Sequence, residues 1–185
     1  MDSFLGIKYA QAKRFEKPQS PTPWNDPYFA ESYGKACPQS PIASIVPMGT
    51  DEDCLFINLF VPNRELSAGE YLPVMQWIHG GAYVSFSGFQ LGTDILASEG
   101  DVIVITFNYR LGALGFLTTG NGDLPGNYGM FDQLKALQWT KDNIRRLVAH
   151  IIAWLFSSLV VIINIFVNEF APQLLAAKLQ GHSRE

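Results

Sequence analysis

The segment from Val74 to Ala82 constrains this chain more than any other stretch of its sequence. An apolar run ends abruptly in His79-Gly80-Gly81-Ala82. Two glycines directly after a buried strand allow the backbone to turn sharply and leave peptide N–H groups facing open space. Such N–H groups bind the negatively charged oxygen that forms during acyl transfer. The segment therefore predicts one half of an ester-cleaving site.

The other half of such a site would be a serine on a G-x-S-x-G turn, and no serine of the sequence fits that pattern. Ser85 and Ser87 lack the flanking glycines, and Ser157 and Ser158 lie in an apolar run. The segment 181–185 (GHSRE) begins like the motif but has Glu in place of the final glycine. Without the strained strand-to-helix turn a serine hydroxyl is neither exposed nor activated. We therefore assign no nucleophile.

Composition and charge exclude several classes of function. A chain of 185 residues with 48% hydrophobic and 16% charged residues is typical of one globular domain. The net charge of -4, the pI near 5.3 and the lack of a basic cluster beyond Arg145 and Arg146 argue against nucleic acid as a partner. No metal-ligand spacing, phosphate loop or cofactor motif occurs, so we expect neither a metal nor a cofactor.

Two cysteines, Cys37 and Cys54, bracket 16 residues. In an oxidising compartment a disulfide between them would contribute about 3 kcal/mol. The alternative is two unrelated buried thiols, and the spacing alone does not choose between them. The residues that follow Met1 have neither a charged nor an apolar region of the kind found in a signal peptide, so we expect none in this sequence.

Three apolar runs predict buried strands, and the fold class is therefore α/β. The runs are 55–61 (LFINLFV), 73–78 (PVMQWI) and 102–107 (VIVITF). Because they carry apolar residues on both faces, we expect central strands of a parallel sheet with helices on each side. The proline-rich and aromatic residues 1–50 are interpreted as an ordered but irregular surface wrap.

The segment after the third strand predicts two loops and a helix. Residues 111–115 and 118–129 are rich in glycine and turn-forming residues, which is typical of loops. A helix is expected over 130–144, with Met130, Leu134, Leu137 and Ile144 on its core stripe. Asp132 is interpreted as lying off the core face or at its margin, where its charge complements the dipole at the start of the helix.

The composition changes after residue 146. Residues 147–167 carry no formal charge, and about 20 apolar residues can cross a bilayer as a helix. The alternative is a buried helix or sequence with no selected role. We therefore expect three parts: a main domain over 1–146, a hydrophobic helix and candidate transmembrane segment over 147–170, and a tail over 171–185.

Five motifs follow one another along the chain, namely 4–10 (FLGIKYA), 51–58 (DEDCLFIN), 77–82 (WIHGGA), 108–112 (NYRLG) and 125–129 (PGNYG). In this order and at this spacing they make the chain resemble the type-B carboxylesterases. This family includes cholinesterases, bile-salt-activated lipases and the non-catalytic neuroligins, and the glycine-rich motifs look closest to the bile-salt-activated lipase branch. The resemblance covers nearly all of residues 4–144 and implies the truncated N-terminal part of an α/β-hydrolase fold, to which the uncharged run adds the expected hydrophobic C-terminal helix.

The resemblance also implies roles for individual residues. Gly81 and Ala82 would supply oxyanion N–H groups, with Gly80 allowing the turn, and Cys37 and Cys54 would form the family's first disulfide. His79 is interpreted as a framework residue, because the family's general base lies much later in the chain. Four further positions would brace the sheet and its loops: Asn108, Arg110, Asn127 and Asp132.

Taken together, the resemblance implies a member of a serine ester hydrolase family. The complete parent would act on a small-molecule or lipid carboxylic ester and would be secreted or reside in the endoplasmic reticulum lumen. This chain alone is expected to be inactive, because the nucleophile elbow, the catalytic acid and the base are missing from it. The alternative function is a neuroligin-like binding module, held at a membrane through residues 147–167.

Overall fold

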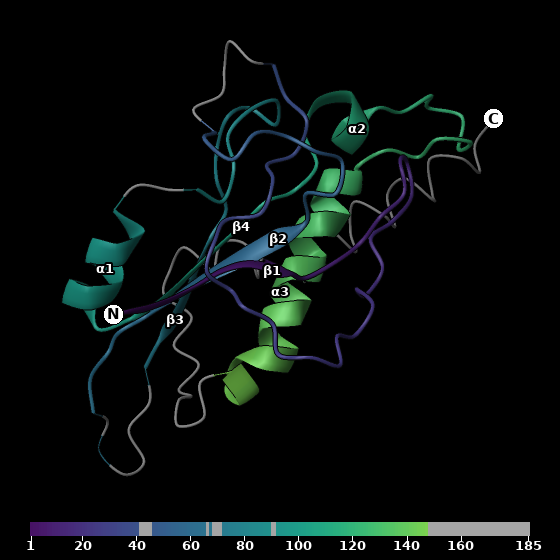
Figure 1. The fold of residues 1–185 in the computed structure, drawn as a ribbon. Helices are drawn as coiled ribbons and strands as arrows, with labels where there is room; N and C mark the ends of the chain where they lie inside the picture. Colours follow the sequence, from purple (N-terminus) through teal and green to yellow (C-terminus); the bar gives the residue numbers. More distant parts are fainter. Residues whose placement is uncertain (41–45, 66, 68–71, 90–91, 148–185) are drawn as a thin grey trace, which may run out of the picture. The chain divides into compact units, whose positions relative to one another are not determined.

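The computed structural model describes residues 1–185 except 41–45, 66, 68–71, 90–91 and 148–185 (Figure 1). The described part is an α/β fold built on one sheet. Its strands are β1 (Asp2–Lys8), β2 (Phe56–Val61), β3 (Val74–Trp77) and β4 (Ile103–Phe107). Its helices are α1 (Thr93–Gly100), α2 (Gly112–Phe116) and α3 (Tyr128–Leu147).

The sheet has the strand order β1-β2-β4-β3 and is mixed, not parallel as expected. β2 runs antiparallel to both β1 and β4, and only β3 and β4 are parallel. The three predicted strands are confirmed, but only β2 and β4 are central. β3 is an edge strand of the described sheet, and its last residue, Trp77, is 38% exposed.

Helices cover both faces of this sheet, as the apolar strands predicted. Alternate residues of β4 point to opposite sides. Ile105 belongs to a core that includes Trp139 and Ile144 of α3. Val104 belongs to a smaller core that includes Ala97 of α1. Figure 1 shows α3 as the longest helix of the described part, lying along the sheet.

Strand β1 corrects the interpretation of residues 1–50 as an irregular wrap. Its outer half is exposed and only Gly6 and Ile7 are buried, so its sequence carries little of the periodicity that indicates a strand. The pairing with β2 shifts register between Phe4 and Ile7, where Gly6 adopts a φ of 70°. Glycine tolerates this left-handed conformation, which is typical of a bulge. The described residues between Tyr9 and Cys54 form isolated bridges and turns, in agreement with the expectation.

The helix over 130–144 is confirmed with wider bounds, but its predicted core stripe is only partly right, because Ile144 is buried whereas Met130 and Leu137 are only partly buried. Leu134 is 44% exposed, whereas Asp132 is completely buried. Ile144 shares a buried face with Asp132, Ala136 and Thr140, which are spaced four residues apart and were not predicted on it. Asp132 lies beyond the first helical turn, which holds no acidic residue, so its predicted interaction with the helix dipole is also wrong.

Two short helices and the disulfide complete the described part. α1 was not expected, and α2 forms where a glycine-hinged loop was predicted. The disulfide between Cys37 and Cys54 is confirmed, with the two Cα atoms 4.9 Å apart. It closes the segment that leads into β2.

No helix of the described residues is long and apolar enough to cross a membrane. The predicted hydrophobic helix over 147–170 lies, apart from Leu147, outside the described residues. The predicted tail over 171–185 also lies outside them.

Candidate active site

The candidate site is the loop that follows β3. Three successive residues of this loop have left-handed backbone angles, with φ of 99° at Gly81, 52° at Ala82 and 62° at Tyr83. A Cβ atom at Gly81 would lie 2.2 Å from the carbonyl oxygen of Ser85, whereas one at Gly80 would meet nothing within 4 Å. The turn therefore requires glycine at position 81. Gly80, expected to allow the turn, adopts an ordinary backbone conformation there.

The peptide N–H groups of Gly81 and Ala82 make no hydrogen bond to any other described residue. The carbonyl oxygen of Gly81, in contrast, accepts hydrogen bonds from the N–H groups of Val84 at 3.0 Å and Ser85 at 3.2 Å. Ala82 is exposed. The loop thus satisfies the Gly81 carbonyl internally, and backbone N–H groups without a partner in the described chain are able to donate to a bound oxygen.

His79 anchors the start of the loop. Its carbonyl oxygen accepts a hydrogen bond from the Tyr109 hydroxyl at 2.8 Å, and its ring stacks on the Tyr109 ring at 4.3 Å. Its Nδ1 lies 2.9 Å from the carbonyl oxygen of Gly80. Burial lowers the pKa of His79 to about 4, although the contact with Gly80 acts in the opposite direction. The imidazole is therefore neutral at physiological pH, and its contacts are those of a framework residue.

Three polar side chains hold the far end of the loop at Gly88. The Gly88 N–H donates to Asn108 Oδ1 at 2.7 Å, and its carbonyl accepts from Thr106 Oγ1 at 2.6 Å and from Asn58 Nδ2 at 3.4 Å. Asn58 also donates to Thr106 Oγ1 at 3.0 Å. All three side chains are buried. The sequence indicated a bracing role for Asn108, but Asn58 and Thr106 were missed.

The two serines of the loop are buried and act within it. Ser85 Oγ donates to the carbonyl of Gly81 at 3.3 Å, and Ser87 Oγ accepts from the N–H of Phe89 at 3.1 Å. Both are less than 8% exposed. Neither has a histidine as a described hydrogen-bond partner, so their contacts are those of loop-stabilising residues.

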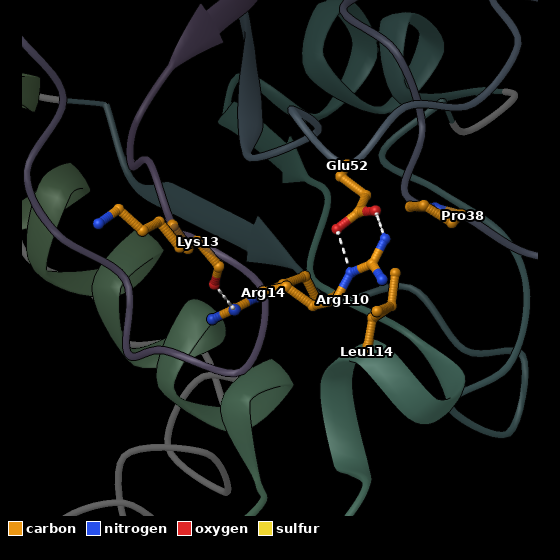
Figure 2. Close-up of a pocket in the computed structure, with 7 residues that line it drawn as sticks. Lys13, Arg14, Pro38, Glu52, Arg110 and Leu114 are labelled. Atoms are coloured by element: carbon orange, nitrogen blue, oxygen red, sulfur yellow. Dashed lines mark hydrogen bonds and ion pairs between the residues drawn. The ribbon is translucent and has the colours of Figure 1, made fainter.

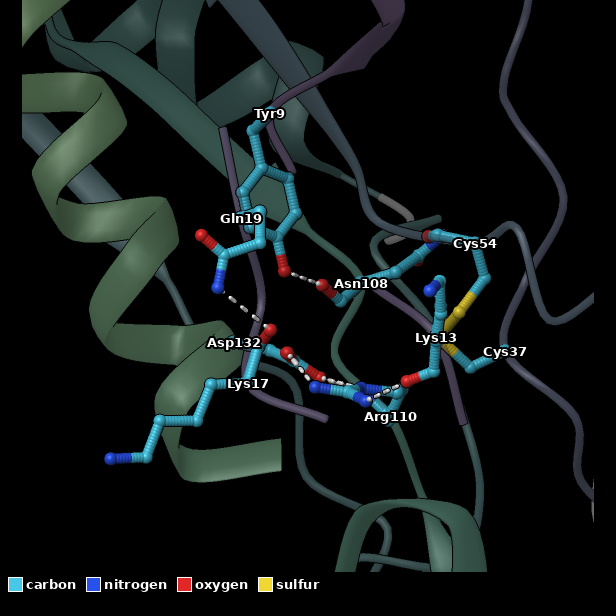
Figure 3. Close-up of polar contacts among 9 residues, drawn as sticks. All are labelled: Tyr9, Lys13, Lys17, Gln19, Cys37, Cys54, Asn108, Arg110 and Asp132. Carbon is cyan, nitrogen blue, oxygen red and sulfur yellow. Dashed lines mark hydrogen bonds and ion pairs between the residues drawn. A yellow bond between two sulfur atoms is a disulfide. The ribbon is translucent and has the colours of Figure 1, made fainter. Parts of the chain in front are cut away.

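Arg110 and Asp132 form a buried ion pair (Figure 3). The guanidinium donates to the carboxylate from Nε and from Nη2, each at 2.7 Å, and the Arg110 N–H adds a third bond at 3.0 Å. Arg110 also binds the carbonyl oxygen of Lys13 at 3.3 Å. This pair fixes α3 against the segment that follows β4. The structural role expected for both residues agrees with these contacts.

A small pocket that is open to solvent lies beside Arg110 and not at the loop (Figure 2). Arg14 binds Glu52 at its rim, with Nε 3.0 Å from Oε2, and Arg110 is already paired with Asp132. The guanidinium groups of Arg14 and Arg110 at this pocket are thus each already paired with a carboxylate. No three His, Cys, Asp or Glu side chains among the described residues lie close enough together to hold a metal ion.

The model of the carboxylesterase family matches residues 1–147 of this chain. The chain belongs to the carboxylesterase family. The five motifs that indicated this family lie in the matched part.

Curated relatives of this carboxylesterase-family chain include enzymes and a neuroligin. Bile salt-activated lipase of Mus musculus is 42% identical over 152 residues, which cover 78% of this chain and 25% of the lipase. Esterase FE4 of Myzus persicae is 43% identical over 148 residues, which cover 77% of this chain and 26% of the esterase. Neuroligin-3 of Mus musculus is 36% identical over an alignment of 188 residues, which covers 78% of this chain and 23% of the neuroligin. The chain thus spans about a quarter of the length of these relatives.

Solved esterases share the fold of the described part. A thermophilic pNB esterase superposes with a TM-score of 0.68 at 38% sequence identity, over 77% of this chain and 31% of that one. Another pNB esterase superposes with a TM-score of 0.66 at 39% sequence identity, over 77% of this chain and 30% of that one. The fold is therefore that of the N-terminal part of a carboxylesterase.

Proposed function

We propose that this chain carries the oxyanion-binding part of a serine carboxylic ester hydrolase site. Gly81 and Ala82 supply the N–H groups that stabilise the negative oxygen of the tetrahedral intermediate. The observation that carries this proposal is the pair of adjacent donors in the loop after β3, neither bound to another described residue. One such donor is worth about 10²- to 10³-fold in turnover.

The substrate of the complete parent protein is proposed to be a small-molecule or lipid carboxylic ester. Support comes from the names of its relatives, which include an esterase and a bile salt-activated lipase. The disulfide between Cys37 and Cys54 supports an oxidising location for the parent, either secreted or in the endoplasmic reticulum lumen.

The 185 residues alone are proposed not to hydrolyse esters. They contain no G-x-S-x-G turn, so no activated serine stands opposite the donors. Purified chain incubated with p-nitrophenyl butyrate should release p-nitrophenol no faster than buffer. Turnover that disappears in a Gly81→Pro variant would overturn this part of the proposal.

The oxyanion role is tested in a chimera that supplies the missing serine. Residues 1–147 replace the matching N-terminal part of mouse bile salt-activated lipase, and p-nitrophenyl butyrate is the substrate. Gly80→Ala and Gly81→Ala are a matched pair, because an added Cβ meets nothing at position 80 and the Ser85 carbonyl oxygen at position 81. We expect Gly80→Ala to keep kcat within about threefold and Gly81→Ala to lower it about 100-fold. Equal activity of the two variants would contradict the assignment.

A second candidate function is a non-catalytic binding module of the neuroligin kind, which needs no serine. The similarity to neuroligin-3 favours it. In this version residues 147–167 would attach the chain to a membrane, ahead of a tail over 171–185. Alkaline carbonate extraction of cells that express the chain would retain it in the membrane pellet, whereas release into the soluble fraction would remove the membrane version.

A further inference from the structure

Gln39 binds the loop that carries the candidate oxyanion donors. Its Oε1 accepts a hydrogen bond from the N–H of Phe86 at 2.8 Å, and its Nε2 donates to the carbonyl of the same residue at 2.8 Å. One carboxamide thus satisfies both backbone groups of Phe86, as a neighbouring strand would. The two residues are 47 positions apart, so this contact joins distant parts of the chain.

Phe86 is a strained residue that lies directly against Gly81. Its φ of 79° is unfavourable for a bulky side chain, and such conformations persist only where surrounding contacts hold them. An added Cβ atom at Gly81 would lie 2.7 Å from Phe86 Cδ2. The position of Phe86 therefore limits where the Gly81 backbone can lie.

The same carboxamide connects the loop to the disulfide. Gln39 Nε2 also donates to the carbonyl oxygen of Cys37 at 3.1 Å. On the other half of the disulfide, the carbonyl of Cys54 accepts from Asn108 Nδ2 at 2.9 Å, and Asn108 Oδ1 accepts from the Gly88 N–H. Figure 3 shows Asn108 beside Cys37 and Cys54. Each half-cystine is therefore bonded to an amide side chain that also binds the loop.

We propose that Gln39 is a positioning residue of the oxyanion loop. By fixing Phe86, and through it Gly81, it sets the loop relative to the segment closed by the disulfide. The catalytic meaning of this brace rests on the proposed oxyanion role of Gly81 and Ala82. The brace, by which we mean the two hydrogen bonds between Gln39 and Phe86, orders the loop whether or not the loop binds an oxyanion. Loop order can be measured without turnover.

The test is amide hydrogen exchange of the full chain, resolved by residue. In Gln39→Met, which keeps the side-chain length but removes both hydrogen-bonding atoms, the Phe86 amide should lose its protection. The amides of Val84 and Ser85, which bind the Gly81 carbonyl, should exchange about tenfold faster. Ile105 in β4 should change by less than about twofold, because global stability is retained. Gln19→Met is the matched control, since among the described residues the Gln19 side chain binds the carbonyl of Lys17 and no residue of the loop.

Unchanged exchange at Val84 and Ser85 in Gln39→Met would overturn the proposal. If Ile105 loses protection by the same factor as the loop, the variant is globally destabilised. The proposal is then tested by nuclear magnetic resonance on the unmodified chain. There, nuclear Overhauser contacts between the Gln39 side-chain amide and the Phe86 N–H support the brace, and their absence overturns it. Failure of the chimera's esterase test with an intact brace would refute the oxyanion role alone.

Discussion

Asp132 on α3 accepts three hydrogen bonds from Arg110, two from its guanidinium and one from its backbone N–H. The pair is almost completely removed from solvent, with Arg110 5% exposed and Asp132 fully buried. Burial raises the pKa of Asp132, and the hydrogen bonds from Arg110 offset part of that rise. Removing one partner would leave an unpaired charge in the core.

Asp132→Ala should therefore lower the free energy of unfolding by about 3–5 kcal/mol. Urea denaturation followed by tryptophan fluorescence measures this change. Asp53→Ala is the matched control, because Asp53 pairs with Lys8 at 2.7 Å but its side chain is 59% exposed. That exposed pair should contribute no more than about 1 kcal/mol. Equal losses in the two variants would show that Asp132 is not a buried anchor.

His79 should make stability depend on pH. The pKa of His79 is about 4 in the folded chain, below the ordinary histidine value of 6.5. Because the folded pKa is depressed, the unfolded chain binds the proton first as pH falls. The stabilisation is complete above pH 6.5 and declines by about 1.4 kcal/mol per pH unit from there to about pH 4.

Urea denaturation at a series of pH values checks this expectation, with His79→Asn as the reference. Asparagine does not titrate, so the difference in unfolding free energy between the two proteins isolates the histidine. As pH falls from 6.5 to 4, the unmodified chain should lose unfolding free energy relative to the His79→Asn variant. A difference that stays constant over this range would contradict the buried, neutral imidazole.

Reduction of the disulfide should lower the free energy of unfolding by about 3 kcal/mol, because the unfolded chain gains the entropy of an open loop. Denaturation curves with and without tris(2-carboxyethyl)phosphine measure the effect. Both cysteines are buried, at 1% and 0% exposure, so reduction should be slow until the chain is partly unfolded. Rapid reduction in buffer without any loss of stability would contradict a structural role for Cys37 and Cys54.

The sequence predicted the strands that consist of continuous runs of apolar residues. β2 and β4 are apolar on both faces because cores lie on both sides of them. β1 and α1 escaped notice because little of either is buried; in α1 the buried residues are Thr93 and Ala97, whereas Ile95 is 63% exposed. On α3 the prediction followed apolar side chains, so it placed Ile144 correctly but missed Asp132, which is buried with its ion-pair partner Arg110.

The turn at the candidate site was predictable because it depends on neighbouring residues in the His79–Ala82 segment. Of its supports, Asn108 was expected from the resemblance, but Gln39 and Asn58 were not, because their hydrogen bonds reach loop residues 47 and 30 positions away. One signal was present in the sequence. Asn58 and Thr106 are single polar residues inside apolar strands, and buried polar groups need partners.

Thr106→Val should destabilise the chain by about 1–3 kcal/mol although it preserves side-chain shape. The Thr106 hydroxyl donates to the carbonyl of Gly88 and accepts from Asn58, so valine leaves two buried polar groups without this partner. Thr106→Ser is the matched control, because it keeps the hydroxyl and removes only a methyl group. Urea denaturation should place the serine variant closer to the unmodified chain, and amide exchange should show greater opening at Gly88 in the valine variant alone. If the serine variant were the less stable of the two, packing of the methyl group would matter more than the hydrogen bonds at this end of the loop.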